Sequence, residues 1–280
     1  MNATQATELG KMLARLTRPQ NALYPALLAG LYAHLSGADA AAVISCGIML
    51  MAAYAVAATY NNIQDVKIDA INKRTDNPLV THVLPHWAPR TVILANSSVI
   101  VLLQLYLAQP ASLLVMGAYF LLLFCYSEPH IRLQARGWWA ILSLALCYGA
   151  LPAALGAMQG ADSLELAPLA LLQILLLSPT LLAKDYKDEK GDRAGGKQTP
   201  LVRYGATAVT LAAYGLALAA CALLLIIVGG RLHLITALGL AAAYLLFVYA
   251  LHRAKGRLPF YASKLASVGL LGISLLAALG

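Results

Sequence analysis

Charged side chains are scarce in this sequence. Asp, Glu, Lys and Arg together make up 11% of its 280 residues, whereas soluble domains usually contain about 25%. Hydrophobic residues reach 60%, and the mean hydropathy is +0.71. The shortage of charge excludes an ordinary soluble domain and predicts an integral membrane protein surrounded by a lipid bilayer.

Cysteine is also rare, and its four occurrences lie far apart in hydrophobic stretches, at Cys46, Cys125, Cys147 and Cys221. The absence of any C-x-x-C pair argues against a zinc site or a disulfide framework, so we interpret these residues as small buried hydrophobic groups. The chain also lacks the pattern of a signal peptide at its start. The residues up to Pro19 are polar and basic and lead directly into a long hydrophobic segment.

Nine hydrophobic segments are long enough to cross the hydrocarbon core, which takes roughly 20 residues of helix, with a range of about 17–25. Turn-forming residues separate several of them, such as those at 36–39 and 229–230. The sequence therefore predicts an all-α integral membrane protein with nine transmembrane helices. The expected helices cover residues 20–36, 40–60, 91–108, 111–127, 138–158, 166–183, 206–228, 232–251 and 260–279.

The positive charges give this arrangement an orientation. With nine spans, 19 of the 20 Lys and Arg residues fall on one side of the membrane, and only Arg231 falls on the other. Because loops rich in Lys and Arg stay in the cytoplasm, we expect a cytoplasmic N-terminus and Gly280 on the opposite side. This distribution explains the net charge of +8, so the charge does not indicate nucleic-acid binding.

Two acidic sequences end hydrophobic segments on the expected cytoplasmic side. The first motif consists of Asn61, Asp65 and Asp69, and the second motif consists of Asp185, Asp188 and Asp192. Residues four apart share one face of a helix, so each motif would present a column of oxygen ligands at the membrane surface. Acidic groups at this depth are costly and therefore indicate a functional site.

The two motifs lie in halves of similar layout. The sequence Pro-Leu-Val follows the first motif at 78–80 and the second motif at 200–202. We interpret the chain as one domain, 1–280, with pseudo-repeats at 20–127 and 138–251 and a last helix at 260–279. Two such halves facing each other would bring both motifs to one central cavity, which the cytoplasmic loops would cap.

The motifs are suited to hard divalent cations. Mg²⁺ prefers oxygen ligands and is usually held by a few carboxylates together with water and substrate phosphates. Basic residues beside the motifs can neutralise phosphate oxygens that the metal does not reach. These residues are Lys73, Arg74, Arg132, Lys184, Lys187, Lys190, Arg193 and Lys197. A metal site and cations at the mouth of an apolar bundle suit a lipid diphosphate, whose head group stays at the rim while its tail enters the bundle.

Both motif spacings, N-x-x-x-D-x-x-x-D and D-x-x-D-x-x-x-D, resemble the UbiA superfamily of intramembrane prenyltransferases, and the resemblance covers nearly the whole chain. It implies nine helices around a central cavity. It also implies Mg²⁺-dependent transfer of a prenyl group from a polyprenyl diphosphate to a small-molecule or lipid acceptor, with an aromatic acceptor expected first. Arg18-Pro19 at the first helix and Tyr126-Ser127-Glu128-Pro129 after the fourth match further features of the superfamily.

The resemblance implies roles for individual residues. Those expected to be catalytic are Asp65, Asp69, Asp188 and Asp192. Those expected to hold the metal are Asn61, Asp65, Asp69, Asp185, Asp188 and Asp192. Those expected to bind the diphosphate are Arg18, Asn61, Lys73, Arg74, Tyr126, Arg132, Lys184 and Lys187.

Three positions depart from the superfamily's pattern. Asn62 stands where an Asp usually follows the first Asn, and Asn77 stands where an Arg commonly precedes the proline. His130 stands where some members have a lysine four residues after the tyrosine, so the cationic role would pass to Arg132. These departures concern contacts to the diphosphate and the assignment to a subfamily.

Alternative functions are weighed against this one. A terpene cyclase of the same fold would capture the allylic cation within its own chain. An ion-coupled transporter would place charges at the middle of its spans, whereas here the charges lie at one face and the third, fourth, seventh and eighth segments lack them in their middles. A structural subunit leaves both motifs unexplained. For a transferase, quinone-type rings, a tetrapyrrole and a glycerol phosphate lipid are all compatible acceptors.

Overall fold

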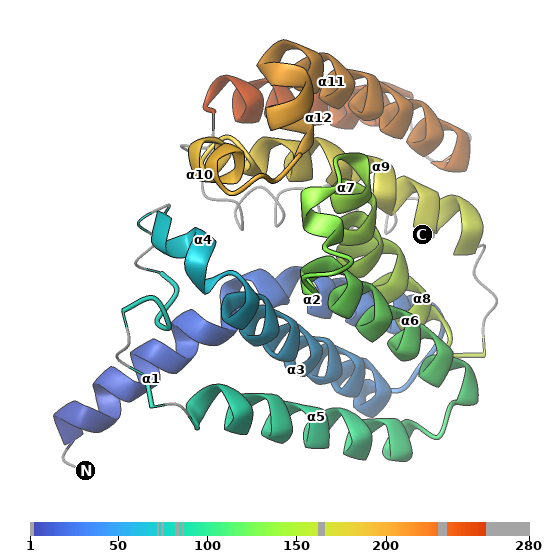
Figure 1. Ribbon diagram of the computed structural model, residues 1–280. Coiled ribbons are helices and arrows are strands. Elements are labelled where there is room, and N and C mark those ends of the chain that lie inside the picture. The colour runs from blue at the N-terminus through green and yellow to red at the C-terminus, as the bar shows by residue number, and fades with distance from the viewer. Residues whose placement is uncertain are drawn as a thin grey trace.

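The computed structural model describes residues 3–71, 73, 76–81, 84–85, 87–161, 166–228 and 234–255, and these residues form helices and their connections (Figure 1). In chain order the helices are α1 (Ala3–Thr17), α2 (Pro19–Leu35), α3 (Ala40–Gln64), α4 (Val66–Ile71), α5 (Ala88–Leu107), α6 (Pro110–Ser127), the 3₁₀ turn η1 (Leu133–Ala135), α7 (Trp138–Ala145), the π-helical turn η2 (Leu146–Ala150), α8 (Leu151–Ala157), α9 (Leu166–Lys184), α10 (Glu189–Ala194), α11 (Pro200–Val228) and α12 (Leu234–Arg253).

Eight of the nine expected membrane helices correspond to helices within the described residues, with α7, η2 and α8 together forming the fifth. Six of these segments are both long and apolar enough to cross a membrane. The helix α2 has 17 residues, and the apolar part of α12, Leu238–Arg253, is also shorter than the six. The ninth expected helix, at 260–279, lies outside the described residues. The chain is thus a multi-pass integral membrane protein.

Lipid-facing and packed helices differ clearly in burial. Leu94, Leu102 and Leu105 on α5 are exposed although the helix is strongly apolar, as expected of side chains that contact hydrocarbon. By contrast, α8 packs closely against α2: a Cβ added at Gly156 would lie 2.1 Å from the carbonyl oxygen of Ala29. Small residues at such contacts let helix backbones approach each other within a membrane. The core therefore lies between α2, α3 and the helices from α6 onward.

The helix α1 precedes the expected membrane helices. It is amphipathic and packs against α3, and Leu16 joins Leu84 and Ala88 in a small separate core. Its boundary with α2 is Arg18, whose backbone is left-handed with φ 49°. Pro19 then occupies the first turn of α2, where its missing N–H leaves no helical bond unmade. The polar N-terminal segment therefore ends by placing Arg18 at the mouth of the bundle.

The connections fall into two groups at opposite ends of the bundle. At one end, on the left in Figure 1, α4 and α10 pack against each other, and the backbone N–H of Gln198 donates to the oxygen of Ala135 at 3.0 Å. The short turns around 36–39 and 158–161 meet at the other end, where Gly160 lies close to the backbone of Ser36. Both acidic motifs and the loops that follow them therefore share one end, as the alternation of spans predicts.

Candidate active site

The first motif forms one helical column across the junction of α3 and α4. Asp65 ends α3 in a single-residue turn, but the i→i−4 hydrogen bonds continue: Asp65 N–H donates to the oxygen of Asn61 at 2.9 Å, and Asp69 N–H to the oxygen of Asp65 at 2.8 Å. The amide of Asn61 also donates to the carboxylate of Asp65 at 3.1 Å. The prediction that these three residues share one face is confirmed.

The second motif has a longer turn between its helices. The helix α9 ends at Lys184, and α10 begins at Glu189. In between, Asp188 N–H donates to the oxygen of Asp185 at 3.1 Å, and Asp192 N–H donates to the oxygen of Asp188 at 2.8 Å. Asp188 and Asp192 line the central cavity, whereas Asp185 is buried beside Lys184, whose Nζ lies 2.5 Å from its carboxylate.

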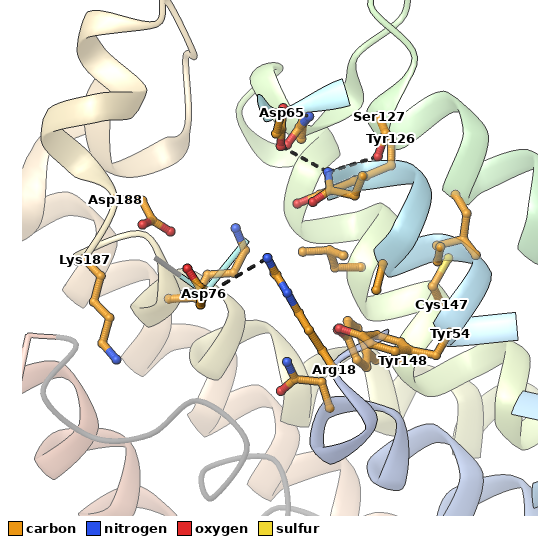
Figure 2. A pocket seen from close by; sticks show the side chains of 18 of the residues that line it. Arg18, Tyr54, Asp65, Asp76, Tyr126, Ser127, Cys147, Tyr148, Lys187 and Asp188 are labelled. Carbon is orange, nitrogen blue, oxygen red and sulfur yellow. Dashed lines mark hydrogen bonds and ion pairs between the residues drawn. The ribbon is translucent and has the colours of Figure 1, made fainter. Parts of the chain in front are cut away.

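The cavity between the motifs has a volume of about 550 Å³ and a polar and an apolar part. Its polar part contains the carboxylates of both motifs together with Arg18, Lys184 and Lys187. In the view of Figure 2 the guanidinium of Arg18 projects into the space between Asp188 and Tyr126. Tyrosine, leucine, alanine and cysteine side chains from α3, α6, the α7–α8 segment, α9 and α12 also line the cavity. The arrangement suits a molecule with an anionic head and a hydrophobic tail.

The expected site residues that the structure describes divide into three groups. Those that line the cavity are Arg18, Asn61, Asp65, Asp69, Tyr126, Lys184, Lys187, Asp188 and Asp192. Two others are held by members of this set: Arg132 lies 3.4 Å from the carboxylate of Asp65, and Asp185 pairs with Lys184. Lys73 is exposed and is not part of the cavity lining. Arg74 lies outside the described residues.

Two asparagines that depart from the superfamily's pattern have structural partners. The buried Asn62 accepts a hydrogen bond from Arg18 at 2.7 Å and donates to the oxygen of Leu16 at 2.9 Å. Asn77 donates to the carboxylate of Asp69 at 2.8 Å and to the oxygen of Asn62 at 3.1 Å. These amides therefore fix both the cation at the cavity mouth and a carboxylate of the first motif.

Residues deeper in the cavity were not identified from the sequence. The hydroxyl of Tyr148 donates to that of Tyr54 at 2.9 Å, and Cys147 lies next to this pair in Figure 2. The π-helical turn η2 brings both Tyr148 and Cys147 into the cavity lining. Such turns often occur at functional sites. In the sequence, Pro152 is the signal that could have indicated this irregular turn. A proline has no N–H, so the carbonyl of residue 148 lacks its usual helical donor.

Asp192 has an altered proton affinity, and it lies outside the membrane-spanning helices. Burial raises its pKa to about 6, and Asp185 and Asp188 act in the same direction. The positive charges of Lys197 and Lys184 oppose this shift. A nearby cation stabilises the ionised form of a carboxylate that is partly buried among other carboxylates, because the two charges are opposite.

The donor set fits a hard divalent ion that is only partly held by protein. Within the part of the chain that the structure describes, no group of three or more His, Cys, Asp or Glu side chains is close enough to form a closed metal site. Instead, each motif contributes two carboxylates to the cavity lining, and Asn61 contributes an amide. Mg²⁺ is commonly bound through one or two carboxylates, with water and phosphate oxygens completing its octahedron.

Comparison with protein families and characterised proteins agrees with this geometry. A model of the UbiA prenyltransferase family matches residues 22–268. The bacteriochlorophyll synthase 33 kDa chain of Cereibacter sphaeroides is 30% identical over 210 residues, which cover 72% of this chain and 68% of that protein.

Solved structures share the fold at low sequence identity. A UbiA homologue from Archaeoglobus fulgidus bound to GPP and Mg²⁺ is 14% identical with a TM-score of 0.75, covering 95% of this chain and 99% of that one. A UbiA homologue from Aeropyrum pernix K1 is 18% identical with a TM-score of 0.70, covering 91% and 96%. A digeranylgeranylglyceryl phosphate synthase is 19% identical with a TM-score of 0.66, covering 97% of each chain.

Proposed function

Because the chain belongs to the UbiA prenyltransferase family, we propose that its central cavity transfers a prenyl group from a polyprenyl diphosphate to a second substrate bound in the same cavity. One observation carries this proposal. Carboxylates of both motifs and the cations of Arg18, Lys184 and Lys187 line the same cavity as the apolar side chains of Leu123, Leu144 and Leu251. An allylic diphosphate requires this combination of charged and apolar groups.

The polar part of the cavity holds the diphosphate in this proposal. Asp65 and Asp69 of the first motif and Asp188 and Asp192 of the second hold Mg²⁺, with Asn61 beside them, in keeping with the Mg²⁺ in the Archaeoglobus fulgidus homologue. When bound, the ion supplies positive charge that stabilises the departing diphosphate.

The cationic side chains complete the binding of the diphosphate. The guanidinium of Arg18 is oriented by Asn62 and also lies 3.8 Å from Asp76, while Lys184 ends α9 and Lys187 lies in the second motif's turn. A guanidinium can form two parallel hydrogen bonds to phosphate oxygens, whereas an ammonium acts as a point charge. These three groups neutralise the phosphate oxygens that accumulate negative charge as the allylic C–O bond breaks.

The apolar part of the cavity protects the reacting carbon. Breaking the C–O bond leaves an allylic cation and a free diphosphate, and the acceptor then forms the new bond and loses a proton. Leu123, Leu144 and Leu251 line the cavity and exclude water from the cation. The hydroxyls of Tyr54 and Tyr148 are polar groups within reach of an acceptor bound beyond the diphosphate.

The reaction can be tested with the full chain reconstituted in lipid vesicles. A labelled allylic diphosphate is supplied with one acceptor at a time, chosen from quinone-type aromatic rings, tetrapyrroles and glycerol phosphate lipids. We expect label to pass to one acceptor class in the presence of Mg²⁺ and no transfer in EDTA. Labelled hydrocarbon formed without an acceptor would identify a terpene cyclase, and no consumption of the diphosphate under any condition would contradict the proposal.

The orientation and internal symmetry are part of the same proposal. Both motifs lie with the lysine- and arginine-rich loops, so we place the site and the N-terminus in the cytoplasm by the positive-inside rule. The layout of long helix, acidic turn and short helix occurs twice, at α3–α4 and α9–α10, which supports a single domain built from two pseudo-repeats. Reporter fusions at the two ends test the topology, and signals from the same compartment would contradict an odd number of spans.

A further inference from the structure

Lys197 joins the two acidic motifs. Its side chain is largely buried, and its Nζ lies 3.5 Å from a carboxylate oxygen of Asp65 and 3.6 Å from a carboxylate oxygen of Asp192. Asp65 belongs to the first motif and Asp192 to the second. A single ammonium group therefore neutralises carboxylates that come from opposite halves of the chain.

The backbone around Lys197 explains why its side chain reaches this position. The helix α10 ends in a Schellman motif, in which Lys197 N–H donates to the oxygen of Asp192 at 2.8 Å and Gly196 N–H donates to the oxygen of Arg193 at 3.3 Å. This turn needs a left-handed residue, and Gly196 supplies it with φ 72°. The pair of glycines before Lys197 thus folds the chain back over the second motif.

Gln134 holds the ammonium of Lys197 in place beside Asp65 of the first motif. Its side-chain oxygen accepts a hydrogen bond from Lys197 Nζ at 3.1 Å, and its amide nitrogen donates to Asp65 at 3.0 Å. Gln134 is itself buried, and the neighbouring Ala135 accepts the backbone hydrogen bond of Gln198. The ammonium is therefore held by two elements, the loop after α6 and the turn after α10.

The position of the ammonium conflicts with that of a metal ion. A divalent cation that used Asp65 and Asp192 as ligands would need oxygen atoms that now face Lys197, and two like charges a few ångströms apart repel each other strongly at a partly buried site. Lysine suits such a replaceable role because its charge is carried on a flexible stem, whereas the fork of an arginine binds in a fixed geometry.

We propose that Lys197 is a resident counter-ion that joins the two motifs and competes with Mg²⁺ for Asp65 and Asp192. The inference rests on the proposed function, since it assumes that these carboxylates receive Mg²⁺. Lys197 lowers the affinity for Mg²⁺ alone and keeps the motifs together until the metal arrives. A purely structural lysine would instead stabilise the fold without changing the affinity for Mg²⁺.

The experiment follows thermal unfolding of the purified full chain in detergent while free Mg²⁺ is raised from zero, in the absence of any diphosphate. Lys197→Met removes the charge and keeps most of the volume. We expect its melting temperature in EDTA to fall below that of the parent, because two buried carboxylates lose a cation. We expect its midpoint for Mg²⁺ to be lower by about tenfold, which is within the range of typical coupling between linked sites.

Two further variants serve as controls. Lys190→Met removes the same charge from an exposed position on α10, so its midpoint should equal that of the parent. Lys197→Arg keeps the charge and should retain the parent's weaker affinity for Mg²⁺. If Lys197→Met does not fold, Gln134→Leu provides a second test: it frees both the ammonium and Asp65, and the midpoint should move in the same direction by less.

The outcomes separate this inference from the proposed function. A clear Mg²⁺ response in the parent with an unchanged or higher midpoint in the Lys197→Met variant would overturn the role of Lys197 and leave the metal site standing. No Mg²⁺ response in the parent or the variant, with or without an added allylic diphosphate, would overturn both. A lower midpoint in Lys197→Met but not in Lys190→Met supports the inference.

Discussion

The two acidic motifs have similar backbones but different electrostatic surroundings. In both, a long helix ends at the motif and a short helix carries its last aspartate, Asp69 in α4 and Asp192 in α10. The first motif receives its cations from elsewhere: Arg132 and Lys197 approach Asp65 from the loops after α6 and α10. The second motif carries its own cation, because Lys184 directly precedes Asp185 and pairs with it.

This difference assigns different tasks to equivalent positions. Asn61 and Asp185 open the two motifs, yet Asn61 lines the cavity while Asp185 is buried against Lys184. The middle aspartates, Asp65 and Asp188, both line the cavity. The spacing of oxygen ligands along a helix thus determines which residues can converge, whereas the neighbouring cations determine which carboxylates remain available for a ligand.

The largest expected effect comes from the middle aspartates, where the two motifs act alike. Asp65→Asn and Asp188→Asn remove one charge each with little change in volume. Each should lower prenyl transfer by roughly 10²–10³, as expected when one electrostatic contact to the leaving group is lost. Because both serve one diphosphate, the double variant should lose much less than the product of the single effects. The measurement is transfer from a labelled allylic diphosphate.

EDTA provides the control for these two variants, since the parent protein should lose its activity in chelator while retaining its helical circular dichroism spectrum. Full activity in either single variant would show that the motifs do not form one site.

The next largest effect is on stability, and it distinguishes the first residue of one motif from the first residue of the other. Asp185→Asn leaves Lys184 without its buried partner, and loss of one member of such a pair should destabilise the protein by up to about 3 kcal/mol. Asn61→Ala removes a neutral amide that donates to Asp65 and Ser127, so it should cost less stability. Thermal unfolding of both variants measures the difference. Equal melting temperatures would mean that Asp185 and Asn61 have equivalent roles.

Much of this organisation could be predicted from the sequence. Segment length and hydropathy locate eight helices within the described residues, and the four-residue spacing correctly gives the column from Asn61 to Asp69. Both signals come from residues that are close together in the sequence, so they can be recognised without knowledge of tertiary contacts. Nine of the expected site residues also line one cavity, because helix ends on the same side of a membrane protein meet.

The features of the site that could not be predicted from the sequence depend on contacts between residues far apart in the chain. Gln134 is unremarkable in sequence, and only the meeting of two loops places it between Asp65 and Lys197. Tyr54 and Tyr148 are 94 positions apart, so no local pattern predicts that their hydroxyls meet. At Gly195-Gly196 the structure shows a Schellman motif that directs the following lysine toward both motifs, and the two glycines alone do not reveal which side chains this lysine reaches. Burial and partner choice, which decide these cases, are properties of the folded bundle.

A smaller effect should follow from the asparagine beside the first motif. Asn62→Ala removes the acceptor that orients Arg18, whose guanidinium lies at the mouth of the cavity. Loss of one hydrogen bond to a charged group typically corresponds to about 1.5–3 kcal/mol, but Arg18 keeps its own charge and Asp76. We therefore expect roughly a fivefold to tenfold rise in KM for the diphosphate, with a smaller change in kcat.

Asn62→Asp is the matched control, because a carboxylate can still accept from Arg18 and should keep KM near that of the parent. A KM that rises equally in both variants would indicate that the amide's bond to the backbone of Leu16, which both variants lose, matters more than its bond to Arg18.

The smallest expected effect concerns pH and the last position of the second motif. Burial raises the pKa of Asp192 from its ordinary 3.8 to about 6, so in this interval the folded protein binds a proton that the unfolded chain has already released. Stability must then fall as pH rises through this window.

Asp192→Asn imitates the neutral form and lacks this dependence. Its melting temperature in EDTA, relative to the parent, should therefore increase between pH 4 and 6 and level off above about 7. Because Asp192 is paired and partly solvated, the gain should be about 1 kcal/mol, or roughly 2–4 °C. A difference that is constant across this pH range would mean that Asp192 ionises as readily in the folded protein as in the unfolded chain, and burial within the second motif would then not raise its pKa.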